Sequence, residues 1–448
     1  MVISALFLFF QSHLNQSRKR VAISSLYLGT GEKERRLVQL LGEKLNENRD
    51  LRATVLLDYT RGTRLDSKLN SSKTLLLPLV QQQQQPKQSK RTDSIDEQKS
   101  KLTIGFFLSP LFSWFPLKRW LLPQAKYNEI VSLQHMKCYL FDDDVIISGA
   151  NLNDQYFTNR QDRYVCIHSP ALADYLEQLV VSLGDISQRL LPDGRFECKV
   201  DILNRNACLD ILSKTKQRLS SINNSNQSIS NDRPLIDNNL VHIVPLMQMR
   251  CFDIIQDEQF TATLFDQLPV DSQVRLTSGY FNLTEKYIDL LTKDKHRENN
   301  CRLEIVMASE QVNSFYKAGG LLSHIPPVYT QLAKNFLKRI RSRNLSEIRL
   351  KSYLRNGWTY HAKGLWLKQQ ACGQMLVMIG SPNFGYRSVY RDLELQCAFF
   401  TRNADLQQQF EEEYRNIVEH THDVDRLDQL PDVKMWIRII LPLIKRFF

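Results

Sequence analysis

The 448-residue sequence has no Cys-x-x-Cys pair, and its eight cysteines are scattered without histidines at a spacing typical of metal ligands. A disulfide scaffold or a zinc site would need such clustering, so we expect neither, and we expect a reducing compartment. The N-terminal apolar run, at residues 2–10, is too short to span a bilayer. No basic segment precedes it, and residues 1–20 lack the arginine- and serine-rich character of a good transit peptide. We therefore expect either that a targeting peptide is absent or that the true start lies upstream.

Positive charge is present in excess. There are 59 Lys and Arg residues against 48 Asp and Glu residues, which gives a formal net charge of +11 at pH 7. This balance favours a polyanionic partner, either nucleic acid, an acidic membrane surface or a phosphorylated small molecule. The hydrophobic share of 42% is sufficient for each of two halves to bury a core.

Two polar stretches divide the chain. The glutamine-rich and charged stretch at 81–101 and the Ser/Asn-rich stretch at 220–234 cannot bury a core, so both are predicted to be loops. The second stretch lies near the middle of the chain. The predicted parts are an N-terminal segment, a first half, a linker and a second half, at residues 1–20, 21–217, 218–238 and 239–448.

The two halves resemble each other in sequence. "SLYLGTGEK" from residue 25 and "SGYFNLTEK" from residue 278 share several residues, and each precedes a strand-like run. Helical patterns fill the gaps between such runs, which indicates an α/β fold. Internal duplication is the simplest explanation.

The first half carries a distinctive polar pattern within "QHMKCYLFDDDVIISGAN". His135 and Lys137 are two positions apart, so they point the same way if this stretch is extended. A buried histidine is ordinarily a satisfied core residue, but an unpaired buried lysine is rare because its charge is costly to desolvate. Asp142 is counted with the catalytic group, although its odd spacing from His135 places it on the opposite strand face. Asn151 and Asp162 follow downstream.

The second half repeats the pattern within "YHAKGLWLKQQACGQMLVMIGSPN". His361 and Lys363 lie on one face of a predicted strand, and a later strand ends in Ser381 and Asn383. Glu394 lies eleven positions after this asparagine, and the same spacing separates the asparagine and the acid of the first half. A lone His-x-Lys pair arises easily by chance. Two copies with matched spacing instead indicate a functional site.

These residues supply what phosphodiester transfer without a metal requires. Two histidines can act as nucleophile and acid if their surroundings hold one neutral and one protonated. Two lysines can place positive charge on the phosphoryl oxygens. The asparagines and the serine can orient substrate, and the two later acids can hydrogen-bond the second nitrogen of each imidazole. We therefore predict one cleft that both halves share.

The two patterns resemble the motifs of the phospholipase D superfamily, His-x-Lys-x4-Asp followed by Gly-Ser-x-Asn. The first copy reads SGAN at the second element, and the second copy has Lys368 where the motif has Asp. Within this superfamily the chain is similar to the eukaryotic phosphatidylglycerophosphate synthase family. That similarity is carried by "YLFDDDVIISGANLNDQYFTNRQDRYV", "SLYLGTG", "GYFNLT", "HAKGLWL", "GSPNFGYRS" and "PLIKRFF".

The resemblance implies a duplicated phospholipase D-type α/β fold whose two pseudo-symmetric halves share one active site. It also implies a transferase of phospholipid biosynthesis. CDP-diacylglycerol would give a phosphatidyl group to a histidine and release CMP, and glycerol 3-phosphate would then take up that group. The product, phosphatidylglycerophosphate, is a precursor of phosphatidylglycerol and cardiolipin. His135 is the favoured nucleophile and His361 the acid and then the base, with no metal or other cofactor required. The implied location is mitochondrial, peripheral to the inner membrane.

The same resemblance marks one glycine-containing turn as a candidate nucleotide-binding segment. An ordinary strand-to-helix turn is the alternative, because the segment lacks the lysine of a P-loop. The segment comprises Ser24, Ser25, Leu26, Tyr27, Leu28, Gly29, Thr30 and Gly31.

Two aromatic and basic stretches, at 105–123 and in the C-terminal "VKMWIRIILPLIKRFF", are predicted either to lie in an anionic membrane surface or to pack within the protein. The main alternative function is a nuclease or phosphodiesterase of the same superfamily, which the net charge would suit. We expect no nucleic acid partner, because a nuclease groove more often interleaves aromatic with basic residues. A binding module without catalysis is disfavoured because both histidines and both lysines are present.

Overall fold

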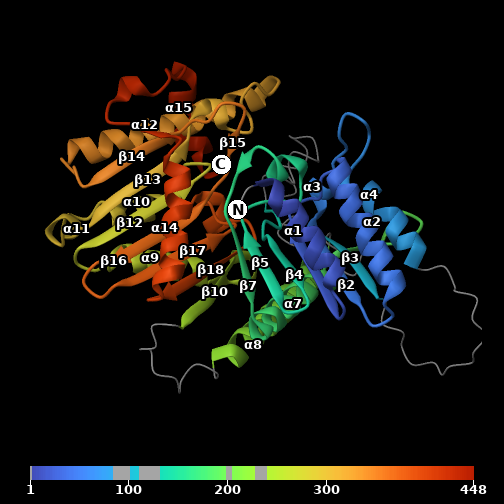
Figure 1. Ribbon diagram of the computed structural model, residues 1–448. Coiled ribbons are helices and arrows are strands. Elements are labelled where there is room, and N and C mark those ends of the chain that lie inside the picture. The colour runs from blue at the N-terminus through green and yellow to red at the C-terminus, as the bar shows by residue number, and fades with distance from the viewer. Residues whose placement is uncertain (1–2, 84–100, 110–131, 198–203, 228–239, 448) are drawn as a thin grey trace, which may run out of the picture.

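The computed structural model of the protein describes residues 3–83, 101–109, 132–197, 204–227 and 240–447. Two α/β halves lie side by side, and each is built around one large mixed sheet (Figure 1). The long helix α8 (Arg205–Gln227) lies in the chain between the last strand of the first sheet and the first strand of the second. The predicted α/β class with two halves is confirmed.

Six strands of each sheet have the same order and directions. In the first sheet they are β7 (Tyr164–His168), β5 (Asp144–Ser148), β4 (Cys138–Phe141), β1 (Arg20–Ser25), β2 (Arg52–Asp58) and β3 (Leu102–Phe107). In the second sheet they are β18 (Glu394–Thr401), β17 (Gln374–Gly380), β16 (Gly364–Gln369), β12 (Ser272–Ser278), β13 (Arg302–Ala308) and β14 (Ile348–Tyr353). The last three strands of each set are parallel to one another, and the remaining pairs are antiparallel. This repeated order confirms the internal duplication.

Other strands extend the sheets or join them. The first sheet continues with β8 (Gln188–Leu190) and β9 (Phe196–Glu197), and the second with β10 (Val241–Met249), β11 (Ile254–Ile255) and β19 (Thr421–Asp423). A short parallel pair formed by β6 (Arg160–Gln161) and β15 (Thr359–Tyr360) connects the two halves directly.

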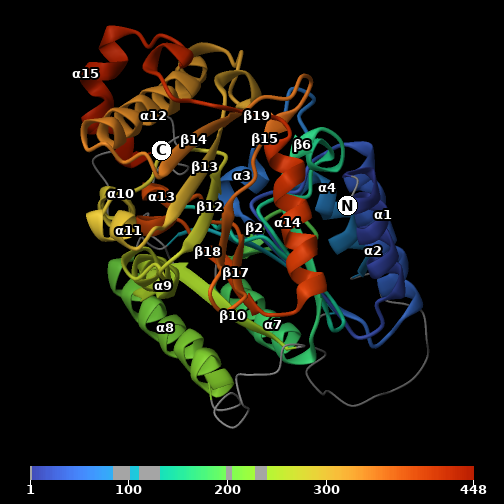
Figure 2. The same ribbon diagram turned by 60° about the vertical axis from the view of Figure 1, so that its left-hand side comes forward.

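Helices cover the sheets. In the first half they are α1 (Ile3–Gln16), α2 (Glu32–Glu47), α3 (Tyr59–Thr63), α4 (Ser72–Gln83) and α7 (Pro170–Asp185). In the second half they are α9 (Gln256–Asp266), α10 (Glu285–Leu291), α11 (Asp294–Glu298), α12 (Ile325–Ser342), α13 (Tyr386–Tyr390), α14 (Ala404–Val418) and α15 (Met435–Ile444). Figure 2 shows α15 beside α12, at the end of the molecule away from α1 and α2.

The local sequence explains these helices. In α2 the buried leucines at 37, 40, 41 and 45 follow helical spacing and face the first sheet. The start of α7 is fixed by Ser169, whose hydroxyl accepts a hydrogen bond from the N–H of Leu172, and by Pro170 at the first helical position.

The apolar core has three main parts. One cluster lies within the first half and another within the second. The third and largest takes residues from both halves, including Ile147 and Met136 of the first and Val377 and Leu395 of the second. Because burial of apolar surface is the main favourable contribution to folding, this shared cluster holds the halves together.

The N-terminal boundary predicted at residue 20 is wrong. Helix α1 packs onto the first half, with Leu6, Phe10 and Leu14 buried in its core. The ring of Phe10 makes edge-to-face contacts with Tyr139 and Phe141 of β4. Residues 3–16 therefore belong to the first half, because the apolar run that is too short for a bilayer is long enough for one packed helix face.

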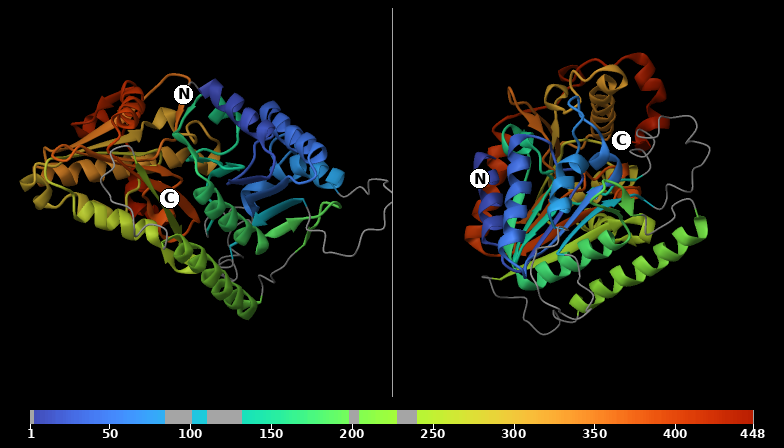
Figure 3. Two further views of the ribbon diagram at one scale, coloured as in Figure 1. Left: turned by 60° about the horizontal axis from the view of Figure 1, so that its bottom comes forward. Right: turned by 90° about the vertical axis from the view of Figure 1, so that its right-hand side faces the viewer.

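The predicted central loop is also partly wrong. Residues 220–227 continue α8, which lies along α7 (Figure 3). Leu212, Leu219 and Ile222 are buried in the shared cluster, so apolar residues at helical spacing carry the helix into the Ser/Asn-rich stretch. Residues 81–83 likewise finish α4, whereas 84–100 and 228–239 lie outside the described residues.

The two aromatic stretches differ in what can be said of them. Residues 105–107 end β3, and residues 110–123 lie outside the described part of the chain. The C-terminal stretch forms α15 and a final turn at Lys445–Phe447. Among the described helices, none combines the length and the apolar character needed to cross a bilayer.

Gly380 ends β17 and begins the Gly-Ser-x-Asn element. A Cβ at this position would lie 2.2 Å from Cβ of Gln396 and 2.4 Å from the carbonyl oxygen of Leu395. We expect Gly380→Ala to lower the free energy of unfolding by about 1–3 kcal/mol, because neither backbone can move aside within the sheet. The control Gly319→Ala adds a Cβ that meets nothing within 4 Å and should have little effect. Denaturant unfolding measures both, and equal stability of the two variants would contradict the close approach.

Candidate active site

The two His-x-Lys segments meet at the junction of the halves. Residues 135–137 lead into β4 and residues 361–363 lead into β16, the matching strands of the two sheets. The N–H of His135 donates to the carbonyl of Leu393 at 2.9 Å, and the N–H of His361 donates to the carbonyl of Gln161 at 2.8 Å. Each segment is therefore hydrogen-bonded to the opposite half, which brings both into one site.

The histidines and carboxylates pair across the junction. Nδ1 of His135 lies 2.9 Å from Oε2 of Glu394, and Nδ1 of His361 lies 2.6 Å from Oδ2 of Asp162. Each imidazole thus contacts a carboxylate of the other half. A carboxylate at Nδ1 favours the proton on that nitrogen and leaves Nε2 free for chemistry.

Both lysines are fully buried at the same junction. Nζ of Lys363 lies 2.6 Å from Nδ1 of His361 and 3.5 Å from Oδ2 of Asp162. Nζ of Lys137 donates to the carbonyl of His135 at 2.7 Å. Burial lowers the pKa of Lys137 well below its usual value and that of Lys363 to about 8, although the neighbouring carboxylates oppose this.

The remaining charges reflect the same environment. Burial raises the pKa of Asp162, against the nearby ammonium of Lys363. Burial also opposes ionisation of Glu394, but contacts with His135, Lys137 and a serine hydroxyl hold its pKa below the usual value. A phosphate anion bound here would favour the protonated lysines, because a nearby opposite charge offsets the loss of hydration.

The predicted orienting residues line this cluster. The amide oxygen of Asn151 accepts from the hydroxyl of Ser25 at 3.4 Å, and the hydroxyl of Ser381 donates to Glu394. Oδ1 of Asn383 and Oε1 of Glu394 are buried and have no hydrogen-bond partner among the residues that the structure describes. A buried polar atom without a partner is costly, so these two oxygens mark where a substrate or water donor would bind.

The structure corrects the role predicted for Asp142. Its carboxylate accepts hydrogen bonds from the N–H groups of residues 18, 19 and 20 at 2.7–3.0 Å. This places it in the turn after β4, at the end of the strand away from Lys137. Lys368, the matching residue of the second motif, lies near the far end of β16, with Nζ 3.4 Å from Glu411. These two motif positions stabilise the sheets and do not reach the histidines.

Sequence reasoning missed Tyr156. Its hydroxyl lies 3.4 Å from both ring nitrogens of His361, and its ring packs edge-to-face on the imidazole at 5.3 Å. Tyr280 packs on the same imidazole at 5.5 Å. Both tyrosines occur in stretches that carry the resemblance, but only the fold shows that they enclose one histidine.

Arg163 was also missed. Its guanidinium is buried, stacks on Trp366 at 3.6 Å and pairs with Glu413 at 2.8 Å. It donates to the carbonyls of Lys363 at 3.4 Å and Met378 at 2.8 Å. A residue of the first half thereby holds the backbone at Lys363. Its position next to Asp162, within a stretch that carries the resemblance, was the available sequence signal.

The candidate nucleotide segment borders the site but does not form an open phosphate cradle. Ser24 accepts a hydrogen bond from the side chain of Gln134, immediately before His135. At the start of α2, however, the carboxylate of Glu34 lies so close that a Cβ on Gly29 would be 2.5 Å from it. Phosphates bind where helix N-termini are open, and a carboxylate already fills this one. The geometry favours the ordinary strand-to-helix turn.

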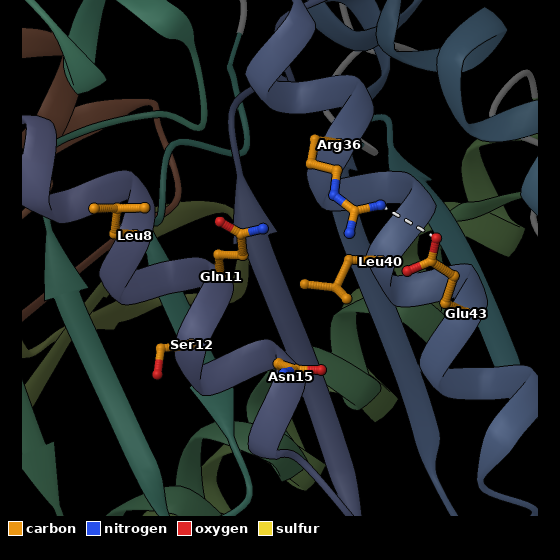
Figure 4. Close-up of a pocket in the computed structure, with 7 residues that line it drawn as sticks. All are labelled: Leu8, Gln11, Ser12, Asn15, Arg36, Leu40 and Glu43. Carbon is orange, nitrogen blue, oxygen red and sulfur yellow. Dashed lines mark hydrogen bonds and ion pairs between the residues drawn. The ribbon is translucent and has the colours of Figure 1, made fainter.

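Two other features lie outside the cluster. An open groove of about 380 Å³ runs between α1 and α2, lined by Leu8, Gln11, Ser12, Asn15, Arg36, Leu40 and Glu43 (Figure 4). None of the predicted site residues lines it. Among the residues that the structure describes, no group of three or more His, Cys, Asp or Glu side chains is arranged to hold a metal ion.

Comparison with curated proteins gives close relatives, whereas no protein-family model matches the sequence. The mitochondrial CDP-diacylglycerol–glycerol-3-phosphate 3-phosphatidyltransferase of Gallus gallus is 37% identical over 476 residues, covering 97% of this chain and 80% of that protein. The Homo sapiens protein of the same name is 35% identical, covering 98% and 80%. A probable CDP-diacylglycerol–glycerol-3-phosphate 3-phosphatidyltransferase of Dictyostelium discoideum is 37% identical, covering 90% and 70%.

A solved structure supports the fold. The phosphatidylserine synthase of Haemophilus influenzae Rd KW20 superposes with a TM-score of 0.69 at 19% identity, covering 99% of this chain and 91% of that one. The superposition includes both halves, so the arrangement of two joined sheets is shared.

The two site histidines make stability depend on pH. Burial lowers the pKa of His135, and lowers that of His361 well below its usual value. The unfolded chain therefore binds protons first as the pH falls through about 6.5, so the free energy of unfolding decreases by up to about 1.4 kcal/mol per pH unit for each histidine. Replacing His361 with Gln should make this decrease shallower than in the wild type. Denaturant unfolding across this pH range measures the slope, and equal slopes would contradict the assignment.

Proposed function

Because this chain belongs to the family of CDP-diacylglycerol–glycerol-3-phosphate 3-phosphatidyltransferases, we propose that it transfers a phosphatidyl group from CDP-diacylglycerol to glycerol 3-phosphate. The products are phosphatidylglycerophosphate and CMP. The observation that carries this proposal is the pair of imidazoles, each hydrogen-bonded to a carboxylate of the opposite half, with two buried lysines beside them. Nucleophile, proton carrier and phosphate-binding charge are thereby present in one site.

The first step is attack on the lipid-bearing phosphorus. Nε2 of His135 forms the new P–N bond, the P–O bond to CMP breaks, and CMP leaves. Glu394 holds Nδ1 of the same ring and stabilises the positive charge that develops there. Lys137 and Lys363 lie on opposite sides of the junction, where they can neutralise the phosphoryl oxygens.

The second step regenerates the free imidazole of His135. The glycerol 3-phosphate hydroxyl attacks the phosphatidyl-histidine, its proton passes to His361, and the P–N bond breaks. Burial lowers the pKa of His361, so the neutral imidazole needed as a base is the favoured form. CMP is a good leaving group, so the first step demands little proton donation. Asp162 orients the His361 ring through Nδ1.

We place the reaction at the surface of the mitochondrial inner membrane. The relatives from Gallus gallus and Homo sapiens are named as mitochondrial. The donor is a membrane lipid, and the excess of positive charge suits an anionic membrane surface.

The activity is tested by incubating the purified protein with CDP-diacylglycerol and labelled glycerol 3-phosphate. We expect labelled lipid and an equal amount of CMP, and we expect both to persist in EDTA because the lysines supply the positive charge. Loss of transfer in chelator with recovery on addition of a divalent ion would contradict the metal-free mechanism.

Two lysines of one segment, one beside the histidines and one away from them, provide a test variant and its control for this assay. Lys363→Ala should reduce turnover by about 10²–10³-fold, which corresponds to about 2.7–4 kcal/mol of transition-state stabilisation. Lys368→Ala, at the motif position that lies away from the histidines, should retain near-wild-type turnover. Similar losses in both variants would mean that Lys363 does not act at the phosphate.

The roles of the histidines are separable by trapping. We expect His135→Ala to abolish transfer and form no covalent lipid adduct. We expect His361→Ala to abolish overall transfer but to accumulate a phosphatidyl-enzyme, since departure of CMP needs little proton donation. Rapid quenching followed by mass spectrometry of the intact protein measures the adduct. An adduct on His135→Ala alone would exchange the two roles.

A further inference from the structure

The C-terminal helix α15 has one buried face and one exposed apolar face. Ile437 and Leu441 pack with Val328 of α12 and with Val433 in a small separate cluster. On the opposite side the side chains of Met435, Ile439 and Leu443 are 75%, 66% and 77% exposed, and Trp436 is 42% exposed. We call the set Met435, Trp436, Ile439, Leu443 and the adjoining Phe447 the α15 face.

Cations surround this face. Lys434, Arg438 and Arg446 are exposed along it, and residues 433–447 contain no Asp or Glu. The nearest acid in sequence, Asp432, faces Lys334 of α12 at 3.5 Å. Exposed apolar residues bordered by basic residues are typical of helices that lie in the headgroup layer of an anionic membrane.

A second copy of the chain fits the same face less well. In a symmetric dimer the same patch meets itself, so the basic border of one copy would face the basic border of the other. Anionic headgroups would instead neutralise these charges. The ten residues of α15 are also too few to span a bilayer, so the helix would lie along the surface.

The end of α15 is connected to the active site. The turn at Lys445–Phe447 packs against α13, and Arg391, directly after that helix, stacks on the ring of Phe447 at 4.4 Å. The side chain of Asn282 donates to the carbonyl of Lys445 at 2.7 Å. Both contacts come from segments next to the site, since α13 follows the Gly-Ser-x-Asn element and Asn282 follows β12.

We infer that the α15 face binds in the headgroup layer of an anionic bilayer and presents the adjoining active site to its lipid substrate. The second clause rests on the function proposed above, whereas the binding itself does not. The helix thereby fixes the orientation of the second half on the membrane.

The binding is tested with the full chain and phosphatidylcholine vesicles, with or without phosphatidylglycerol. We expect co-sedimentation with anionic vesicles and much weaker association with neutral ones. The double variant Ile439→Glu, Leu443→Glu should lose roughly tenfold or more of its vesicle affinity, because it places charge where apolar side chains would be buried. The control Val270→Glu changes another exposed aliphatic residue, 55% exposed, and should bind as the wild type does. Unchanged binding of the double variant would overturn the inference.

Two further measurements separate the possible outcomes. Turnover of CDP-diacylglycerol in detergent micelles should be equal in the double variant and the wild type, whereas turnover of vesicle-embedded substrate should fall only in the double variant. If the wild type binds vesicles but is inactive on both substrates, the proposed function fails while membrane binding stands. Sedimentation velocity without lipid tests whether the α15 face instead joins two copies of the chain. The inference would be overturned if the wild type self-associates, the double variant does not, and the double variant binds vesicles as the wild type does.

Discussion

The crossed hydrogen bonds between histidines and carboxylates are the interaction on which the rest of the site depends. His135 contacts Glu394, and His361 contacts Asp162, so each half supplies the partner that the other half needs. Neither imidazole can be oriented unless the halves are docked. The large cluster of apolar residues from both sheets provides that docking, and Arg163 adds a buried contact across it. Catalytic geometry and packing between the halves are therefore one constraint.

The carboxylates of these pairs also offset the cost of burying two lysines beside them. An ammonium group loses its hydration on burial, which is costly unless opposite charge is close. Asp162 lies 3.5 Å from Nζ of Lys363 as well as 2.6 Å from His361. The space is so tight that a Cβ on Gly149 would lie 2.7 Å from both Asp162 and Lys363. This explains why a glycine follows β5 two residues before Asn151, because any side chain there would displace the charge pair.

Much of this arrangement could be predicted from the sequence, because duplication leaves repeated spacing along the chain. The two His-x-Lys pairs and the later acids were found in that way, and the structure brings them together. The crossing of the pairs could not be predicted, since spacing within one half does not reveal contacts to the other. Residues 3–16 and 220–227 were misassigned because tertiary packing decides whether a short apolar run or a polar stretch joins a helix. Strand parity had already separated Asp142 from His135, and its contacts with backbone N–H groups agree with that separation.

The duplication is imperfect where chemistry needs the halves to differ. A nucleophile and a proton carrier cannot have identical surroundings, since one must attack phosphorus while the other takes up a proton. The carboxylate that contacts His135 belongs to Glu394, which also accepts a hydrogen bond from the hydroxyl of Ser381. His361 instead contacts an ammonium at 2.6 Å and lies between two tyrosine rings. These neighbours disfavour the imidazolium and suit a residue that acts as a base. The duplicated fold thus places His135 and His361 at matching positions, and their different neighbours suit one to act as nucleophile and the other as base.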